Sequence, residues 1–475
     1  SAPSLAERKK PVPNSTPMAW GWGLALLAGV CVLAGFGHRR KWRNRGFSKM
    51  KSAGMNLGGV ELDASQVRAY VGVGLGLGSL ALPVWVLLPI FIDNKIAQDP
   101  NLPGLTEETL TITTTAIFAG WMVGCLCLPR LLLVFNQEQL LVGSICGLLL
   151  VAISTITVPH LTNGSLWVFT LVRFVYGIFM NMVLLETIYI QEAMPEGFGI
   201  PALVSINVVF CCVDIFQAYL CGGPMFYWDW RLQAGLLYSV PLVLSLYIGF
   251  PNWWDILCSI PNSSKRLFTS EGPSDAAKEL HTTLSAKELK YGLALASAFL
   301  ACGCAFWGLN YSVGQLSTNR YRSMMFFSAA DILGYSSALT AAAYGRSQVQ
   351  AAAFLLAAFC LFVCSTGERV SILVMSSAMM GRICLDLCWS TIYAFNDIFS
   401  ETARRKVMPA CEITTRIGGI LAPFSGTLPP FVSCKFFALL CLLAGLCSMH
   451  LPDSPYTSRK EQKILCIDSP RIHMK

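Results

Sequence analysis

The sequence predicts a polytopic α-helical membrane protein, and three observations support that fold class. Hydrophobic residues make up 54% of the 475 residues and charged residues only 13%, whereas a soluble domain carries about 25% charged residues. The apolar residues fall into blocks of about 20, the length of a helix that spans a bilayer core. The blocks are too long and too evenly apolar for barrel strands, so we expect helices, which satisfy their own backbone hydrogen bonds in lipid.

The first apolar block covers residues 18–37 and is followed by a basic stretch over residues 38–45. This pattern is typical of a signal anchor or an organelle-targeting segment, and also of an extra N-terminal helix that the protein retains. The sequence leaves both alternatives open. Twelve further transmembrane helices are expected at residues 69–92, 110–128, 140–158, 166–190, 200–220, 232–250, 291–309, 323–344, 349–364, 372–395, 408–424 and 432–447.

A polar link separates six of these helices from the other six, so we expect two six-helix halves. A short internal repeat supports two related halves. Gly177 lies ten residues before Thr187, and Gly381 lies ten residues before Thr391, with Ile-Tyr after each threonine. The expected parts are an N-terminal extension, a first half, an inner link, a second half and a polar tail, at residues 1–68, 69–250, 251–290, 291–450 and 451–475.

Basic residues between the helices predict which side of the membrane each loop faces. They gather before the first of the twelve helices at residues 39–51, after the eighth at Arg346 and after the tenth at Arg404. Because an even number of helices separates these links, all of them lie on one side. By the positive-inside rule, that side is the cytosol or the matrix of an organelle.

Other function classes lack their motifs. The 19 cysteines lie mostly inside apolar blocks without zinc-ligand spacing, so we expect packing residues and no metal. No nucleophile elbow or P-loop occurs. The alternating glycines from Gly72 to Gly78 follow no strand, which favours close helix packing over a dinucleotide site. We therefore expect neither an enzyme nor a cofactor, and we assign the net charge of +8 to the loops rather than to nucleic-acid binding.

Three stretches carry a family resemblance. They cover residues 381–424, which contain Thr415-Arg416-Ile417-Gly418-Gly419, residues 307–331 and residues 344–352. They resemble the tenth and eleventh helices, the seventh and eighth helices and the inner eight–nine loop of the organic cation, anion and zwitterion transporter family. That family is part of the major facilitator superfamily. The resemblance implies the major facilitator fold, with twelve transmembrane helices in two six-helix halves, and transport by alternating access.

The chain departs from the family where the two halves are normally latched together. Gly124 remains in the inner two–three loop, but the acidic residue of that motif is missing and Arg130 is the one arginine left. Arg346 keeps one basic group in the matching loop of the second half, beside Gly345. The segment after the sixth helix reads Pro251-Asn252-Trp253-Trp254 instead of the family's acidic-Ser-Pro-Arg sequence. These losses motivate an alternative, a transport-inactive scaffold subunit of a larger membrane complex.

Ionisable residues inside the predicted helices are functional candidates, because a charge in the bilayer is costly. Arg382 and Asp386, and likewise Glu412 and Arg416, are four residues apart and can pair on one helix face. Such pairing would make burial tolerable without any transport. The full set consists of Arg173, Glu186, Asp214, Asp331, Arg382, Asp386, Glu412 and Arg416.

Arg416 tips the expected substrate toward anions or zwitterions. In the resembled family, this eleventh-helix position is acidic in cation transporters and arginine in anion and zwitterion members. A guanidinium binds a carboxylate through two parallel hydrogen bonds, although Glu412 one turn away weakens that bias. The substrate-binding candidates are Arg416, Glu412, Asp386, Arg382, Asp214, Asp331, Tyr393, Trp389 and Tyr189.

The aromatic members of that set have two interpretations. Their rings would line a pocket for a flat organic ion, or they would pack against the core or the lipid. Arg173 is expected near the inner end of the fourth helix, in structural contacts rather than in substrate binding. Gating or structural roles are expected for Arg173, Glu186, Gly124, Gly345, Arg346 and Arg404.

The resemblance thus implies a secondary transporter of small organic ions, leaning anionic or zwitterionic, that is embedded in membrane lipid. The scaffold subunit is the alternative from another class. We expect a multi-pass integral membrane protein in either case. The resemblance favours the plasma membrane, whereas the basic N-terminal extension points to a plastid or mitochondrial membrane.

Overall fold

The computed structural model describes residues 55–57, 60–195, 199–259, 284–316, 319–341, 346–366 and 372–452. The first apolar block at 18–37, most of the inner link and nearly all of the polar tail lie outside these residues, so the expectations for them stay predictions. Within the described part the chain is almost entirely helical. A short hairpin precedes the helices, in which β1 (Met55–Leu57) pairs antiparallel with β2 (Val60–Leu62).

All twelve expected transmembrane helices are present. The first half consists of α3 (Ala64–Arg68) continuing into η2 (Ala69–Ala81) and α4 (Leu82–Ala97), then α5 (Glu107–Val134), α6 (Gln137–Leu161), α7 (Leu166–Phe179) with α8 (Met182–Ala193), α9 (Gly199–Gly222) and α10 (Trp230–Gly249). A short helix, α11 (Trp253–Cys258), follows it. The second half consists of α14 (Ala286–Leu316), α15 (Arg320–Ala341), α16 (Arg346–Thr366), α17 (Ile372–Ile392) with η3 (Tyr393–Ile398), α18 (Glu401–Leu421) with η4 (Ala422–Gly426), and α19 (Pro430–Ser448).

Nine helices in the described part of the chain are long and apolar enough to cross a membrane. The three expected helices outside this set are the fourth, which is broken between α7 and α8, and the eighth and eleventh, α15 and α18. In the described part, these three carry five of the nine buried arginine, aspartate and glutamate residues, namely Arg173, Glu186, Asp331, Glu412 and Arg416. The fourth helix is outside the set because its segments are short, whereas α15 and α18 are long enough but less apolar, and both hold charge inside the bundle.

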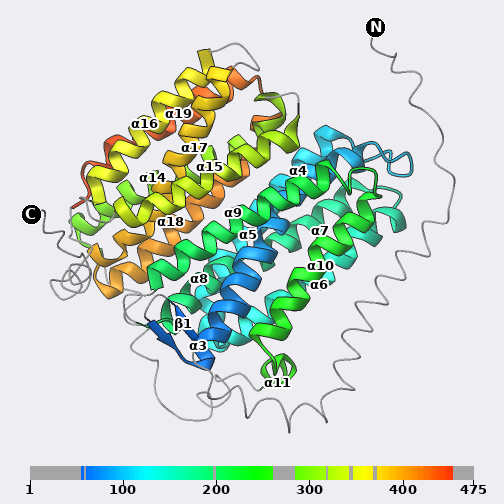
Figure 1. The fold of residues 1–475 in the computed structure, drawn as a ribbon, viewed down its shortest axis with the longest axis horizontal. Coiled ribbons are helices and arrows are strands. Elements are labelled where there is room, and N and C mark those ends of the chain that lie inside the picture. Colours follow the sequence, from blue (N-terminus) through cyan, green and yellow to red (C-terminus); the bar gives the residue numbers. More distant parts are fainter. Residues whose placement is uncertain are drawn as a thin grey trace, which may run out of the picture.

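The helices form two groups that correspond to the two expected halves (Figure 1). In the first half α5 packs against α7, and η2 packs against α10; in the second half α14 packs against α18, and α16 packs against α19. Two helix pairs, α9 with α15 and α5 with α18, make the main contacts between the halves. Under the internal repeat, α5 corresponds to α15 and α9 to α18, so these two pairs are related by the same pseudosymmetry.

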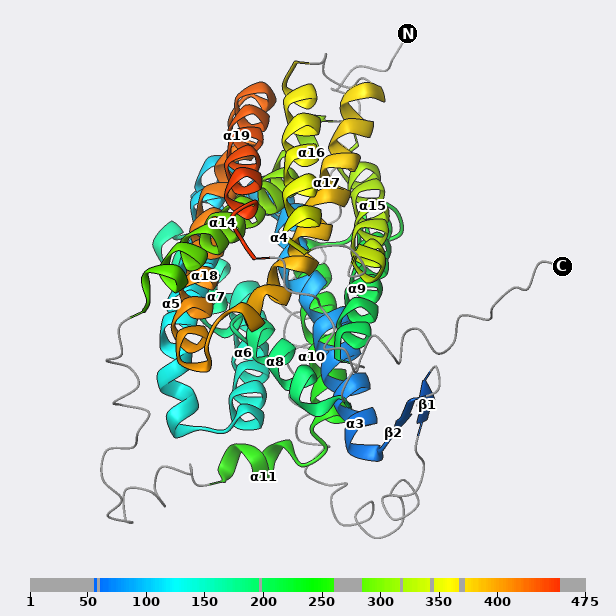
Figure 2. The same cartoon turned by 90° about the vertical axis from the view of Figure 1, so that its left-hand side faces the viewer.

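The two ends of the bundle are distinguished by their loops. The loops at residues 98–106 and 223–229 lie at one end, which we call the outer end after the positive-inside expectation. Figure 2 shows α11 and the β1–β2 hairpin together at the opposite, inner end.

Glycines allow the closest helix contacts within each half. A Cβ atom added at Gly177 of α7 would lie 1.9 Å from the carbonyl oxygen of Ile117 on α5. In the second half, a Cβ atom added at Gly303 of α14 would lie 2.4 Å from the carbonyl oxygen of Thr415 on α18. Small residues at helix seams let backbones approach in lipid, where tight packing rather than water exclusion holds helices together. The close contact at Gly303 also fixes the position of Arg416 along the bundle, because Arg416 follows Thr415 on α18.

Candidate functional site

All eight ionisable residues that the sequence places inside helices are buried in the structure. Their exposed fractions lie between 0% for Asp386 and 4% for Glu186. They separate into groups on different helices, and we name the three that contain an arginine. The Arg416 cluster is Arg416, Glu412, Tyr393 and Trp121; the Arg382 cluster is Arg382, Asp331, Asp386 and Asp214; the Arg173 cluster is Arg173, Asp93 and Thr114.

The Arg416 cluster lies where α18 of the second half meets α5 of the first. Arg416 Nη2 donates a hydrogen bond of 2.8 Å to Glu412 Oε2, so the pair expected from the four-residue spacing is formed. The guanidinium carbon lies 3.6 Å from the ring centre of Trp121. The Tyr393 hydroxyl donates a 2.7 Å hydrogen bond to Glu412 Oε1. Arg416 Nε has no hydrogen-bond partner among the described residues, so this edge of the guanidinium is available to a ligand.

Aromatic side chains of both halves meet beside Arg416. Phe118 of α5 lies between Trp121, at 6.3 Å between ring centres, and Trp307 of α14, at 5.8 Å. The indole nitrogens of Trp121 and Trp307 are buried and lack a hydrogen-bond partner in the described structure. One turn along α14 from Trp307, both polar atoms of the Asn310 amide are also buried without a partner. Because buried polar groups are nearly always hydrogen-bonded, this group of free donors and acceptors favours a site that receives a polar ligand.

The aromatic candidates of the second half join this region, and that of the first half does not. Trp389 lies 5.8 Å from Phe306 and 6.4 Å from Tyr393, measured between ring centres. Tyr189 instead donates a 3.3 Å hydrogen bond to Glu138 Oε1 on α6. It is therefore a contact between helices of the first half, away from the three arginine clusters.

The pairing of Arg382 differs from the one that its spacing suggests. Arg382 donates two hydrogen bonds to the carboxylate of Asp331 on α15, from Nε to Oδ1 at 2.7 Å and from Nη2 to Oδ2 at 2.8 Å. Its Nη1 donates to the carbonyl oxygen of Phe306 at 2.8 Å, and the guanidinium carbon lies 3.6 Å from the Phe306 ring centre. The expected self-neutralising pair of Arg382 with Asp386 is therefore wrong, because a carboxylate on the neighbouring helix offers the two-pronged geometry that a guanidinium prefers.

Asp386 is left as a fully buried carboxyl group. Neither of its oxygens has a hydrogen-bond partner among the described residues, although Asp331 and Tyr335 lie close by. Asp214 of α9 approaches from the other half, near enough to Asp331 for the two carboxylates to repel each other. Its Oδ1 atom is also buried without a partner. Three carboxyl groups thus share one arginine at the contact between α9, α15 and α17.

The Arg173 cluster is located differently from expectation. Arg173 lies in the outer half of the fourth helix, since α7 begins at the outer end, and not near the inner end. Its Nη2 forms a 2.5 Å ion pair with Asp93 Oδ1 on α4, and its Nη1 donates to Thr114 on α5 at 3.2 Å. Sequence reasoning missed Asp93 because it stands just past the last residue of an apolar block. A polar residue at such an edge, opposite a buried arginine, is the signal that would have found it.

The remaining gating or structural candidates either make local contacts or lie outside the described part of the chain. Glu186 of α8 faces Gly78 of η2, where an added Cβ would lie 2.7 Å from Glu186 Oε1. The carbonyl oxygen of Gly124 accepts a 2.8 Å hydrogen bond from the Asn181 amide. Arg346 is buried in the first turn of α16. Gly345 and the side chain of Arg404 lie outside the part of the chain that the structure describes.

A further polar cluster closes the outer end of the first half. Arg231 of α10 forms a 2.5 Å ion pair with Asp99, and the Trp230 indole donates to the same carboxylate at 3.1 Å. Burial opposes ionisation of Asp99. Hydrogen bonds from Trp230 and the Asn101 backbone, with the charge of Arg231, outweigh that effect and hold the pKa of the Asp99 carboxyl below its usual value. The segment at residues 229–231 therefore ties the start of α10 to the loop after α4.

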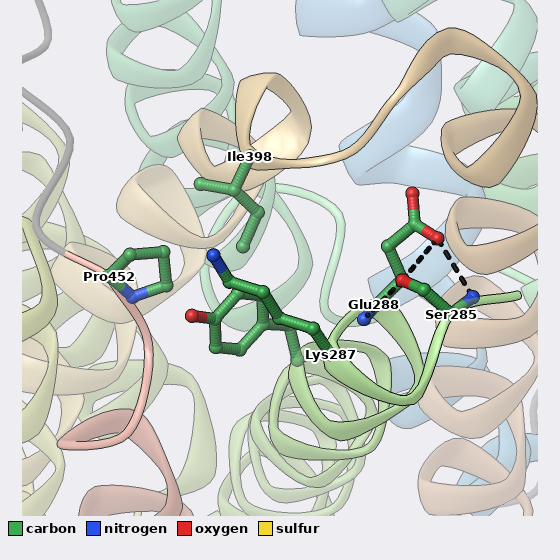
Figure 3. A pocket seen from close by; sticks show the side chains of 6 residues that line it. Ser285, Lys287, Glu288, Ile398 and Pro452 are labelled. Carbon is green, nitrogen blue, oxygen red and sulfur yellow. Dashed lines mark hydrogen bonds between the residues drawn. The ribbon is translucent and has the colours of Figure 1, made fainter.

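One cavity of about 380 Å³ lies at the inner end, between the start of α14, η3 and the end of α19 (Figure 3). Glu288 accepts hydrogen bonds from the Ser285 hydroxyl and the Ser400 hydroxyl, both at 2.7 Å, and so joins α14 to the α17–α18 connection. The cavity contains none of the residues of the arginine clusters, although Ile398 belongs to the same short helix, η3, as Tyr393. Its lining consists of Ser285, Lys287, Glu288, Tyr291, Ile398 and Pro452.

Comparison with known proteins gives a consistent family of relatives, although no family model matches the chain. Organic anion transporter 3 of Oryctolagus cuniculus is 24% identical over 398 residues, which cover 76% of this chain and 72% of that protein. Solute carrier family 22 member 15 of Xenopus tropicalis is 23% identical over 401 residues, covering 76% and 73%. An organic cation transporter protein of Drosophila melanogaster is 29% identical over 158 residues, 31% of this chain and 28% of that protein.

Solved structures with the same fold include two transporters from E. coli. The xylose transporter in its inward open conformation aligns with a TM-score of 0.56 at 13% identity, over 84% of this chain and 99% of that one. The fucose:proton symporter aligns with a TM-score of 0.53 at 12% identity, over 82% and 100%. The relatives confirm the resemblance seen in the motifs, and the solved structures confirm the major facilitator fold of a multi-pass membrane protein.

Proposed function

We propose that this multi-pass membrane protein with the major facilitator fold is a secondary transporter of small organic ions, with a preference for anions or zwitterions. Its similarity to organic anion and organic cation transporters supports the substrate class. The observation that carries the proposal is Arg416, a buried guanidinium at the contact between the two halves with one edge free. Transporters of this fold bind substrate near the midplane, between their repeats.

Arg416 is the anchor for the substrate's negative group. Nε is free, and Nη2 is held by one hydrogen bond to Glu412, so an incoming carboxylate can take both positions by displacing Glu412 from a single contact. Glu412 keeps its hydrogen bond from Tyr393 when this happens. In a zwitterion, the released Glu412 carboxylate would receive the positive group. Two opposite charges one helical turn apart therefore suit a substrate that carries both.

The aromatic side chains beside Arg416 supply the apolar part of the site. Trp121 presents its ring face to the anchor, and Phe118 connects it to Trp307. The indole nitrogens of both tryptophans lack partners among the described residues. Small-ligand sites combine a mostly apolar wall with a few converging polar groups. The unpartnered amide of Asn310 is one such group. A flat organic ion with one acidic group fits this combination.

Alternating access is the mechanism that we assign to the protein, and the outer contacts between the halves support it. The Tyr321 ring of α15 stacks on Phe91 of α4 at 5.3 Å between ring centres. An added Cβ at Gly222 of α9 would lie 2.7 Å from Tyr321. Arg320 donates a 3.3 Å hydrogen bond to the carbonyl oxygen of Ile90. These contacts close the outer end, so the site would open to that side by separation of α15 from α4 and α9.

The test is substrate uptake into proteoliposomes. Wild type, Arg416→Ala, Arg416→Lys and Arg322→Ala would each be given an aromatic carboxylate, a betaine and a quaternary ammonium ion. Arg322 is an exposed arginine on α15 and serves as the matched control. We expect saturable uptake of the carboxylate or the betaine by wild type and the control. Arg416→Ala should lose about tenfold or more, since a hydrogen bond to a charged group contributes about 1.5–3 kcal/mol. Arg416→Lys keeps the charge but not the planar fork and should be intermediate.

Two results would contradict the proposal at different levels. Uptake that is equal in wild type and Arg416→Ala would remove the anchor but keep the transporter. Uptake no faster than in empty liposomes, from monodisperse protein that copurifies with a larger membrane complex, would support the scaffold subunit. Location in the plasma membrane, rather than in a plastid or mitochondrial membrane, is a further prediction of the resemblance, and membrane fractionation tests it.

A further inference from the structure

The Arg382 cluster contains more carboxyl groups than its single arginine can pair with. Nε and Nη2 of Arg382 are both bonded to Asp331, and Nη1 is bonded to the Phe306 carbonyl. All three nitrogens of the guanidinium thus donate to other partners, and none of these bonds reaches Asp386. Asp386 is 0% exposed, and neither carboxyl oxygen has a hydrogen-bond partner in the described structure.

A buried carboxylate without hydrogen bonds is so costly that the group binds a proton instead. The backbone of α15 packs closely against the Asp386 side chain. A Cβ added at Gly334 of α15 would lie 2.6 Å from Asp386 Cβ and 3.2 Å from its Oδ2. The carboxyl group is therefore pressed against α15. In addition, the described residues contain no group of three or more His, Cys, Asp or Glu side chains arranged to hold a metal ion. A proton fits this position better than a larger cation.

We propose that Asp386 is the proton-binding site that couples a proton gradient to substrate movement in this protein. The inference names the coupling ion of the transport proposed above, and its flux experiment rests on that proposal. The observation that carries it is an unpartnered buried carboxyl beside an arginine that already serves another carboxylate across the contact between two helices.

The groups that face Asp386 are mostly acidic or neutral. From α15 they are Asp331 and Tyr335, and from its own helix, α17, the nearest charge is Arg382. Four cysteine thiols surround it, and none of them adds positive charge; they are Cys211 of α9, Cys302 of α14, and Cys384 and Cys388 of α17. Asp214 of α9 lies on the far side of Asp331. Arg382 is therefore the one cation near this carboxyl group among the described residues.

The position of Arg382 couples the protonation of Asp386 to the contact between the two halves. Arg382 and Asp386 are one helical turn apart, a spacing at which the two side chains can meet. When Asp386 loses its proton, it competes with Asp331 for Arg382. Asp331 is then a less neutralised charge at the contact with α9, where it lies close to the Asp214 carboxyl group, and such a charge is costly to keep buried. Because α9 and α15 form one of the two main contacts between the halves, deprotonation of Asp386 favours their separation, and protonation favours their contact.

The first test needs no substrate. Wild type, Asp386→Asn, Asp386→Glu and Asp255→Asn would be reconstituted, and infrared difference spectra between acidic and alkaline pH recorded. Asp255 is an exposed aspartate on α11 and serves as the control. We expect a protonated-carboxyl band that titrates in wild type and Asp255→Asn, is shifted in Asp386→Glu and is lost in Asp386→Asn. A titrating band that is unchanged in a folded Asp386→Asn would overturn the proposal.

The second test measures the coupling itself. Uptake of the carboxylate and the betaine would be driven by an inside-alkaline gradient of one pH unit, with the membrane potential clamped at zero. One proton per substrate supports about tenfold accumulation, because one pH unit corresponds to about 1.4 kcal/mol. Asp386→Asn should not accumulate substrate. Wild-type flux that ignores the pH gradient or follows a sodium gradient would overturn proton coupling while leaving transport intact. A titrating Asp386 band without flux of any substrate would support the proton site and remove the proposed function.

Discussion

At the scale of single residues, the arginines of the three clusters are tolerated in the bundle because each is both paired and stacked. Arg382 lies 3.6 Å from the ring centre of Phe306, and Arg416 lies at the same distance from Trp121. An aromatic face attracts a cation most strongly when water is excluded. Each guanidinium therefore has an acidic partner in one direction and a ring in another. The two differ in their nitrogens, since all three of Arg382 donate hydrogen bonds, whereas Arg416 Nε has no partner among the described residues.

Replacing Arg382 by alanine should destabilise the protein strongly. The change leaves Asp331 buried and unpaired, and breaking one partner of a buried ion pair costs about 3–5 kcal/mol. Arg322→Ala, at an exposed arginine, should change stability by about 0.5 kcal/mol or less. Thermal unfolding in detergent, followed by tryptophan fluorescence, measures both. The double variant Arg382→Met with Asp331→Leu should recover most of the loss, because it removes the unpaired charge. A single variant as stable as the Arg322 control would show that Asp331 finds another partner.

The burial of the charged residues could be predicted from the sequence, but their partners could not. All eight stand within apolar blocks, and the cost of a charge in lipid turns them toward the bundle interior. Spacing along one helix indicated two pairs, of which Glu412 with Arg416 is formed and Arg382 with Asp386 is not. Asp331 is 51 residues from Arg382 along the chain. Only the packing of α15 against α17 brings the two together.

At the scale of helices, the apolar blocks predicted where each helix lies along the chain, but not where a helix is broken. Each of the twelve blocks contains a helix, but the fourth is divided between α7 and α8. The break occurs at Asn181, whose side-chain amide donates to the Gly124 carbonyl on α5. No proline marks the break, because its cause is a partner on another helix. The β1–β2 hairpin was also not expected, since strands of three residues carry too little pattern to recognise.

Glycines in the helices separate into those that form a seam and those that do not, and substitution should distinguish the two kinds. Gly177→Ala places a Cβ 1.9 Å from the Ile117 carbonyl oxygen, so α5 and α7 must move apart. Overpacking of this kind costs about 1–3 kcal/mol. Gly143 of α6 has nothing within 4 Å of an added Cβ. Gly143→Ala should therefore stabilise by about 0.4–1 kcal/mol, because alanine restricts the unfolded chain.

Unfolding temperature and size-exclusion profile, measured side by side, test this pair of changes. Gly177→Ala should unfold at a lower temperature than wild type and Gly143→Ala at a higher one. Equal shifts in the same direction would mean that helix propensity alone governs both positions. The α5–α7 seam would then lack the tight packing that its distances describe.

At the scale of the whole molecule, the two halves are joined by rings at the outer end and, deeper in the bundle, by the contact of Arg416 with Trp121. Tyr321 contacts Phe91, Phe226 and Gly222 of the other half. Below these rings, the Arg416 and Arg382 clusters occupy the two symmetry-related contacts, α5 with α18 and α9 with α15. One contact therefore holds the proposed substrate anchor and the other the proposed proton site. With this arrangement, substrate binding at one contact and proton binding at the other would both change the rocking of one half against the other. The two contacts lie on opposite sides of the pseudosymmetry axis.

If Tyr321 closes the outer end, removing its ring should expose a cysteine that is now protected. Cys221 is 1% exposed and precedes Gly222, which packs on Tyr321. Ring contacts contribute about 0.5–1.5 kcal/mol each, and Tyr321 makes two of them across the halves. Tyr321→Ala should thus raise the open population by roughly 5- to 150-fold, the range that corresponds to about 1–3 kcal/mol.

Labelling with a water-soluble maleimide in nanodiscs, mapped by mass spectrometry, measures that population. The rate at Cys221 should rise in Tyr321→Ala and stay as in wild type in Tyr227→Ala, whose tyrosine is 91% exposed at the same end. The exposed Cys258 on α11, at the inner end, should label equally fast in all three. If Cys258 alone reacts and Cys221 stays protected in Tyr321→Ala, the aromatic contacts are not the outer closure. In that case the deeper contacts of α5 with α18 and of α9 with α15 hold the halves together, and closure depends on the protonation of Asp386 rather than on the rings above it.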